Sequence, residues 1–117
     1  MPSVPAVAVA VLADCPHTPQ VALTAHQVID CNTPCASCAN EGENWICATC
    51  GVTLCGRHVN GHMLLHREET RHPIACGILD LSFWCYECEE YLAPTNPRLR
   101  PYYNALCISK FGEGPPN

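Results

Sequence analysis

The chain has 117 residues and a formal net charge of −5 with histidine neutral, with Lys110 as its single lysine. A nucleic-acid interface needs clustered basic side chains, so binding to DNA or RNA is not expected. Aromatic residues make up only 7% of the chain and prolines number 11, so a length typical of one domain carries a thin apolar core.

Residues 1–14 form an apolar, proline-bearing lead, which either adds an edge strand to a sheet or stays disordered. The apolar stretch from Val4 to Ala13 lacks a basic start and is too short to span a bilayer, so neither a secretory signal nor a membrane segment is expected. The odd number of cysteines, 11, argues against a complete disulfide framework. These features favour a reducing compartment, cytoplasmic or nuclear, where clustered cysteines typically bind metal.

The next feature along the chain is a series of paired cysteines. After a short ligand turn at Cys15-Pro16-His17 and an irregular stretch over 18–34, the spacing Cys-x2-Cys occurs three times, at Cys35/Cys38, Cys47/Cys50 and Cys85/Cys88. One tight turn of this spacing aims two sulfurs at one zinc ion. Short strands are expected over 44–47 and 51–54 around the second pair, and a strand pair over 74–79 and 82–85, joined near Asp80.

Two helices are expected. His62, Leu65, His66 and Glu69 recur at helical spacing within residues 61–69, and Asn60 is placed to cap that helix. Residues 96–110 suit a second helix that starts at Pro97 or Pro101. Its core-facing residues would be Leu99, Tyr102 or Tyr103, and Leu106.

Twelve cysteines and histidines suit three tetrahedral zinc sites: Cys15, His17, Cys35, Cys38, Cys47, Cys50, Cys55, His62, His66, His72, Cys85 and Cys88. Spacing alone does not decide how they are shared, although the i, i+4 spacing of His62 and His66 favours one common ion. No site needs an open position, so the metals are expected to be structural. Cys31, Cys76 and Cys107 are interpreted as small apolar fillers and His26 as a solvated loop residue.

The fold expected is a small zinc-stapled α+β domain: a twisted antiparallel sheet of about five short strands, with two helices and three zinc ions. The zinc-bearing domain would span residues 15–111, between the lead 1–14 and a flexible tail at 112–117.

The chain resembles the ubiquitin-specific-protease-type zinc finger (the ubiquitin-binding UBP, or BUZ, domain), and within that family the fingers of ubiquitin-binding histone deacetylases. Five motifs carry the resemblance: Cys35-x2-Cys38, Glu43-Asn44-Trp45-Ile46-Cys47-x2-Cys50, Cys55-Gly56-Arg57, Asn60-Gly61-His62-x3-His66 and Trp84-Cys85-Tyr86-x-Cys88. It covers about residues 15–113. It implies three interleaved zinc sites, namely Cys15, His17, Cys85 and Cys88; Cys35, Cys38, Cys55 and His62; and Cys47, Cys50, His66 and His72.

The resemblance also implies a pocket for the free C-terminal diglycine of ubiquitin, formed by Trp45, Gly56, Arg57, His58, Asp80, Trp84, Tyr86 and Tyr91. Arg57 and Tyr86 would hold the terminal carboxylate, and Trp45, Trp84 and Tyr91 would wall a channel too narrow for side chains. Asp80 would take a polar contact with the tail. His58 departs from the tyrosine that follows the arginine in the closest family members.

Other interpretations of the same residues stay open. Arg57 could be a surface arginine paired to Glu41 or Glu43, and both tryptophans could belong to the core. Glu41, Glu43, Glu87 and Glu89 could meet the arginines of an incoming tail or be ordinary solvated charges.

The function expected is a monomeric, non-catalytic reader of free ubiquitin or unanchored ubiquitin chains, with no nucleic-acid or membrane partner. The alternatives are a purely structural or scaffolding zinc module, and an E3-type cross-braced module that recruits a ubiquitin-conjugating enzyme. The last leaves Arg57 and the tryptophans unexplained. No enzyme is expected, because no remaining cysteine has a base and an orienting group. The chain could be an accessory domain of a deacetylase or deubiquitinase.

Overall fold

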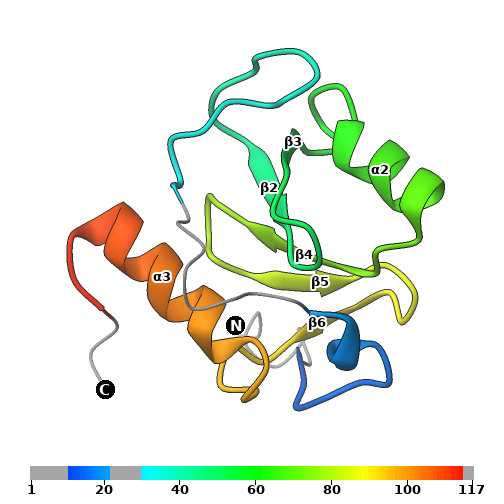
Figure 1. Cartoon of the computed structure of the whole chain (residues 1–117), viewed down its shortest axis with the longest axis vertical. Helices are drawn as coiled ribbons and strands as arrows, with labels where there is room; N and C mark the ends of the chain where they lie inside the picture. Colours follow the sequence, from blue (N-terminus) through cyan, green and yellow to red (C-terminus); the bar gives the residue numbers. More distant parts are fainter. Residues whose placement is uncertain (1–10, 22–29, 115–117) are drawn as a thin grey trace, which may run out of the picture.

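A computed structural model describes residues 11–21 and 30–114, so the predictions for residues 1–10, His26 and 115–117 lie outside the described residues. The elements in chain order are β1 (Val11–Leu12), the 3-10 turn η1 (Thr18–Gln20), β2 (Asn44–Cys47), β3 (Thr53–Cys55), α2 (His62–Thr70), β4 (Ile74–Gly77), β5 (Phe83–Cys85), β6 (Glu90–Leu92) and α3 (Arg100–Phe111). Figure 1 labels those from β2 to α3. The strands form one sheet in the order β1-β6-β5-β4-β2-β3.

The predicted α+β fold is confirmed, with six strands rather than about five. Four of the five strand pairs are antiparallel, and β1 pairs with β6 in parallel. The sequence did not indicate β6, because three residues that directly follow a ligand turn are too few to show alternation. The end of the lead adds an edge strand, which the Asn96 amide extends by donating to Ala13 O at 2.8 Å.

Strand alternation divides the sheet into two faces. Ile46, Ile74, Phe83 and Leu92 point to the face that α3 covers, where they form one buried cluster with Leu99, Tyr102 and Leu106. The residues between them in sequence point to the other face, because successive side chains of a strand alternate. Met63 of α2 covers part of that second face together with Leu54 and Ala75. In Figure 1, the two helices accordingly lie at separate parts of the sheet.

Both helix starts differ in detail from the prediction. Helix α2 follows Gly61, whose φ of 68° is left-handed, and no side chain caps it. Asn60 is therefore not a cap; its Nδ2 lies 3.3 Å from Cys38 Sγ. Helix α3 begins at Arg100 with Pro101 in its first turn. Tyr102 rather than Tyr103 is fully buried, and its hydroxyl donates to Ala48 O at 2.7 Å.

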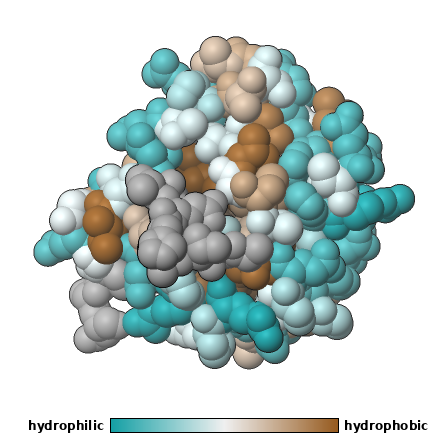
Figure 2. Space-filling model, in the orientation of Figure 1, coloured by the Kyte–Doolittle hydropathy of each residue, from teal (hydrophilic) through white to brown (hydrophobic). Residues whose placement is uncertain are grey.

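The three cysteines left over from the ligand count pack as fillers. Cys76 and Cys107 are buried, and Cys31 is half-buried against the α3 cluster. Across residues 11–21 and 30–114, the helices are all too short or too polar to cross a membrane. Hydrophilic residues dominate the face in Figure 2, with hydrophobic ones confined to separate patches.

Candidate functional site

Twelve side chains gather in three groups of four. The groups are Cys15, His17, Cys85 and Cys88; Cys35, Cys38, Cys55 and His62; and Cys47, Cys50, His66 and His72, and in each the ligand atoms lie within 4.8 Å of one another. They are the same three sets that the family resemblance implies. The first group joins the chain's ligand turn at Cys15 to the hairpin between β5 and β6, and so ties together segments about 70 residues apart in sequence.

The spacing between ligand atoms tests whether zinc fits. A tetrahedral ion with Zn–S near 2.3 Å and Zn–N near 2.0–2.1 Å needs edges of about 3.6 Å for S–N, 3.3 Å for N–N and 3.8 Å for S–S. In the first group, His17 Nδ1 lies 3.4 Å from both Cys85 Sγ and Cys88 Sγ. In the second, Cys35 Sγ is 3.5 Å from His62 Nδ1 and Cys38 Sγ is 3.9 Å from Cys55 Sγ.

The third group has two histidines and also fits. His66 Nε2 lies 3.3 Å from His72 Nδ1 and 3.4 Å from Cys50 Sγ. Burial lowers the pKa of His66, and so does the neighbouring His72, which favours the neutral imidazole that metals bind. His62 and His66 are in different groups, so one helix turn bridges two metal centres. The i, i+4 spacing alone would have given both histidines to one ion.

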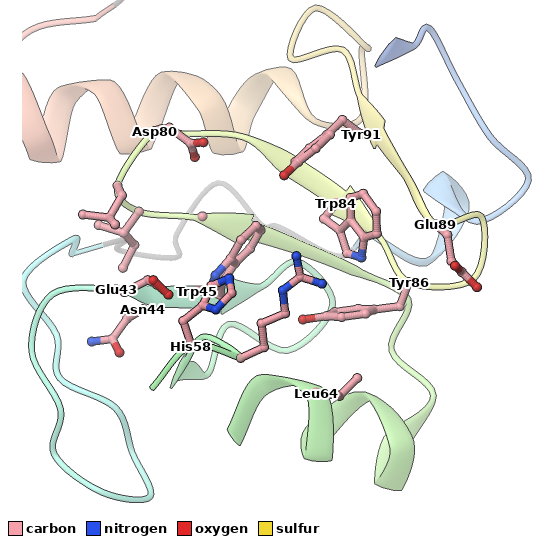
Figure 3. Close-up of a pocket in the computed structure, with 14 residues that line it drawn as sticks. Glu43, Asn44, Trp45, His58, Leu64, Asp80, Trp84, Tyr86, Glu89 and Tyr91 are labelled. Carbon is pink, nitrogen blue, oxygen red and sulfur yellow. The ribbon is translucent and has the colours of Figure 1, made fainter. Parts of the chain in front are cut away.

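A cavity of about 410 Å³ opens on the sheet face opposite α3. Figure 3 shows side chains from β2, from the β5–β6 segment, from α2 and from the loop after β3 around it. Seven of the eight residues predicted for a ubiquitin pocket line it: Trp45, Arg57, His58, Asp80, Trp84, Tyr86 and Tyr91. The eighth, Gly56, is buried beside Trp45.

Strand register explains why the aromatic rings meet. Trp45 of β2 lies opposite Gly77 of β4, and Trp84 of β5 lies opposite Tyr91 of β6. All four residues are on the same face, because alternation sends their neighbours toward α3. The rings of Trp84 and Tyr91 meet edge to face, with centroids 4.9 Å apart. Both tryptophans are half-buried, so neither is only a core residue.

Two glycines seat the Trp45 indole flat on the sheet. A Cβ at Gly56 would lie 3.0 Å from Trp45 Nε1, and a Cβ at Gly77 would lie 3.1 Å from Trp45 Cη2. Any side chain at either position would press on the ring. The indole can therefore form one wall of the cavity only because both of its ends rest on residues without a Cβ.

Arg57 projects from a tightly held loop. Its neighbour Gly56 donates its N–H to Glu43 O at 2.9 Å and accepts from the N–H groups of Val59 and Gly61 at 3.0 Å. Arg57 is exposed, and within residues 11–21 and 30–114 its guanidinium has no hydrogen bond or ion pair. The alternative pairing with Glu41 or Glu43 is thus not formed.

Tyr86 faces the same end of the cavity. Its N–H donates to Pro73 O at 2.7 Å, which fixes its backbone beside the third group. Burial raises the pKa of Tyr86 to about 12, and the positive charge of Arg57 opposes that rise. The phenol is therefore protonated at neutral pH and can donate a hydrogen bond next to a guanidinium.

The turn between β4 and β5 forms the opposite rim. Asp80 Oδ1 accepts from the hydroxyl of Ser82 at 2.7 Å and from its N–H at 3.2 Å. Lys110 of α3 donates to Ile78 O and Leu79 O of the same turn. Asp80 is exposed, so its carboxylate can accept further hydrogen bonds from a ligand.

Sequence reasoning missed several lining residues, among them Leu64, Gly77 and Leu79. The placement of Gly77 depends on the register of β4 against β2, and the placement of Leu64 depends on how α2 packs, so neither has a signal in the sequence. Of the four acidic residues considered, Glu43 and Glu89 line the cavity. Glu41 does not, and Glu87 instead pairs with Arg67.

Comparison with known proteins gives the family. A profile of the zinc finger found in ubiquitin hydrolases and other proteins matches residues 35–97, more than half of the chain. The chain is 42% identical over its full 117 residues to histone deacetylase 6 of Caenorhabditis elegans. It is 56% identical over 63 residues to the NAD-dependent deacetylase sir2A of Dictyostelium discoideum. In each case it spans only 12% of the relative's length.

A solved structure of an essential yeast splicing factor shares the fold. It superposes with a TM-score of 0.59 at 14% identity, over 75% of this chain and 23% of that one. The profile match and the full-length similarity, together with ligand groups that fit three zinc ions, lead to one conclusion. The chain belongs to the family of zinc fingers found in ubiquitin hydrolases and other proteins.

Proposed function

We propose that the chain is a non-catalytic module that binds the free C-terminal diglycine of ubiquitin or of unanchored ubiquitin chains. One observation carries the proposal: Arg57 lines a cavity walled by aromatic rings, yet its guanidinium has no partner among the described residues. A planar guanidinium next to a phenol donor is suited to a carboxylate, which it can engage with two parallel hydrogen bonds.

The shape of the cavity favours glycine as the residue that enters it. The walls are the indole of Trp45 on one side and the rings of Trp84 and Tyr91, which meet edge to face, on the other. Ubiquitin ends in Leu-Arg-Leu-Arg-Gly-Gly, and only glycines present a bare backbone to such a slot. Asp80, on the rim, would accept an N–H of the tail.

The same chemistry favours unanchored ubiquitin. In an isopeptide bond the terminal carboxylate is gone, so the tail would enclose Arg57 without offering a counter-charge. Leaving one member of a buried ion pair without its partner costs about 3–5 kcal/mol, although the exposure of Arg57 in the free protein lowers that figure.

The metals would hold this geometry and take no part in chemistry. We assign one zinc ion to each of the three groups, with all four positions filled by protein ligands, and the domain itself to residues 15–111. Bound zinc would supply a fixed charge and a rigid crosslink. Arg57 comes two residues after Cys55, and Tyr86 directly follows Cys85, so the two groups proposed to hold the carboxylate are anchored by different ions.

A calorimetric titration with free ubiquitin tests the proposal. Arg57→Ala should abolish measurable binding, while the zinc content stays at three ions per chain. Arg57→Lys, which keeps the charge but not the fork, should bind more weakly than the unmodified chain. Unchanged affinity in Arg57→Ala would show that the arginine is only a surface charge.

A further inference from the structure

An ion pair beside the cavity joins α2 to the turn between β5 and β6. Arg67 of α2 donates to the Glu87 carboxylate, in the turn between β5 and β6. The two side chains are only 19% and 34% exposed. The Nε of Arg67 is buried with no hydrogen-bond partner in the part of the chain that the structure describes, and the Glu87 carboxylate is the counter-charge of this half-buried guanidinium.

Each member of the pair lies close in sequence to a residue that lines the cavity. Glu87 directly follows Tyr86, and Arg67 lies one helical turn after Leu64, so that both neighbours line the cavity while the pair itself does not. Residues three apart share a helix face, which directs Arg67 along the same side of α2 as Leu64. Figure 3 shows Leu64 and Tyr86 on α2 and on the strand side of the cavity, respectively.

Among the described residues, α2 reaches this side of the sheet through the buried cluster that contains Met63, against which Tyr86 packs, and through the Arg67–Glu87 pair. The helix packs on β2 and β3, and its packing onto β5 and β6 is much less extensive. Tyr86 has its backbone N–H fixed by Pro73, but among the described residues no hydrogen bond holds its hydroxyl.

We propose that the Arg67–Glu87 pair is a strap that sets the width of the slot at the Tyr86 end, which makes Arg67 a positioning residue for Tyr86. This rests on the proposed function and adds a determinant of its selectivity. With the strap closed, the phenol stands at a fixed distance from Arg57 and the slot admits only glycine. With the strap open, the slot widens, carboxylate binding weakens and a larger final residue is tolerated.

The direction in which Glu87→Gln changes the affinity for the tail distinguishes a positioning role of the pair from a purely electrostatic effect. Glu87→Gln removes a negative charge near the site, so electrostatics alone would tighten the binding of an anionic tail. A broken strap weakens it instead. Arg67→Met should weaken it as well, and the exchange Arg67→Glu with Glu87→Arg should restore most of the loss, because it rebuilds the pair with reversed polarity.

The experiment is calorimetry with two free-acid peptides, Leu-Arg-Leu-Arg-Gly-Gly and the same peptide ending in Gly-Ala. For Glu87→Gln we expect about fivefold weaker binding of the first peptide and a smaller preference for it over the second, as for coupled neighbouring groups. Glu68→Gln, an exposed charge on the same helix, is the matched control and should change neither quantity. Zinc content and thermal unfolding, measured in parallel, report any general loss of structure, which by itself would leave the preference unchanged.

Two outcomes overturn different claims. If the unmodified chain prefers the diglycine peptide, and Glu87→Gln binds it equally or more tightly with the same preference, the strap is refuted while the proposed function stands. If the unmodified chain binds neither peptide, the proposed function itself fails.

Discussion

The close contact between the Trp45 indole and Gly77 predicts that Gly77→Ala weakens ligand binding while it changes the free energy of unfolding little. Gly77→Ala places a Cβ 3.1 Å from Trp45 Cη2 and 3.2 Å from both Asp80 Oδ1 and Ser82 Oγ, whereas ordinary contacts begin at 3.4 Å. The ring edge must therefore move by about 0.3 Å. The sheet lies behind it, so the ring moves outward into the cavity. Gly77 does not have a left-handed φ, so alanine brings no backbone strain.

The sizes of the two effects depend on whether the strain from the added methyl group is present in the free protein or only when a tail is bound. Overpacking by one methyl group costs about 1–3 kcal/mol. In the free protein, the Trp45 ring can tilt outward and relieve much of this overpacking cost. Alanine also stabilises the fold by about 0.4–1 kcal/mol, because it restricts the unfolded chain. A bound tail would push the ring back and restore the strain. We therefore expect the free energy of unfolding to change by about 1 kcal/mol or less, and the affinity to fall between about five- and 150-fold.

Urea denaturation and calorimetry with the Leu-Arg-Leu-Arg-Gly-Gly peptide measure the two effects. Gly114→Ala is the control, because its added Cβ would meet open space without a left-handed φ, and it should change neither. Full affinity in Gly77→Ala would refute the reasoning, since the Trp45 ring could not then be a wall of the binding slot.

Three further substitutions or treatments test other parts of the structure. Stripping zinc with a chelator should unfold the domain, seen as loss of the near-ultraviolet circular dichroism signal and its return on adding zinc; an unchanged spectrum would contradict a structural role for the metals. Tyr102→Phe leaves the buried Ala48 carbonyl without its donor and should lower the free energy of unfolding by about 1–2 kcal/mol in urea, with zinc content unchanged. A loss below 0.5 kcal/mol, as an order-of-magnitude limit, would mean that the carbonyl finds another donor. Lys110→Met releases the carbonyls of Ile78 and Leu79, and should weaken peptide binding several-fold in a calorimetric titration, because the same turn presents Asp80. Equal affinity would remove that turn from the site.

Local patterns predicted most of the fold, because zinc knuckles and strand alternation act over a few residues. Strand β2 has the predicted bounds, and Leu99, Tyr102 and Leu106 pack as expected. The parallel pairing of β1 with β6 could not be predicted, since it joins residues some 80 positions apart and two strands of only two and three residues.

The site was predictable only in part for a similar reason. The spacing of the ligands allowed several ways of sharing them, and the family resemblance rather than the spacing implied the interleaved scheme. The glycine seats of Trp45 come from cross-strand register, which the sequence does not state. The Arg67–Glu87 pair joins residues 20 apart; Arg67 lies outside the motifs, and Glu87 stands at the unspecified position of the Trp84-Cys85-Tyr86-x-Cys88 motif.

The central claim is that Arg57, within a cavity held rigid by the three zinc sites, binds the terminal carboxylate of a diglycine tail. The most direct test is a calorimetric comparison of Leu-Arg-Leu-Arg-Gly-Gly as the free acid and as the C-terminal amide. Binding of the acid with the amide at least about a hundredfold weaker, the loss of a buried charge pair, is the predicted result. Equal binding of the two peptides, or binding of neither, would contradict the account.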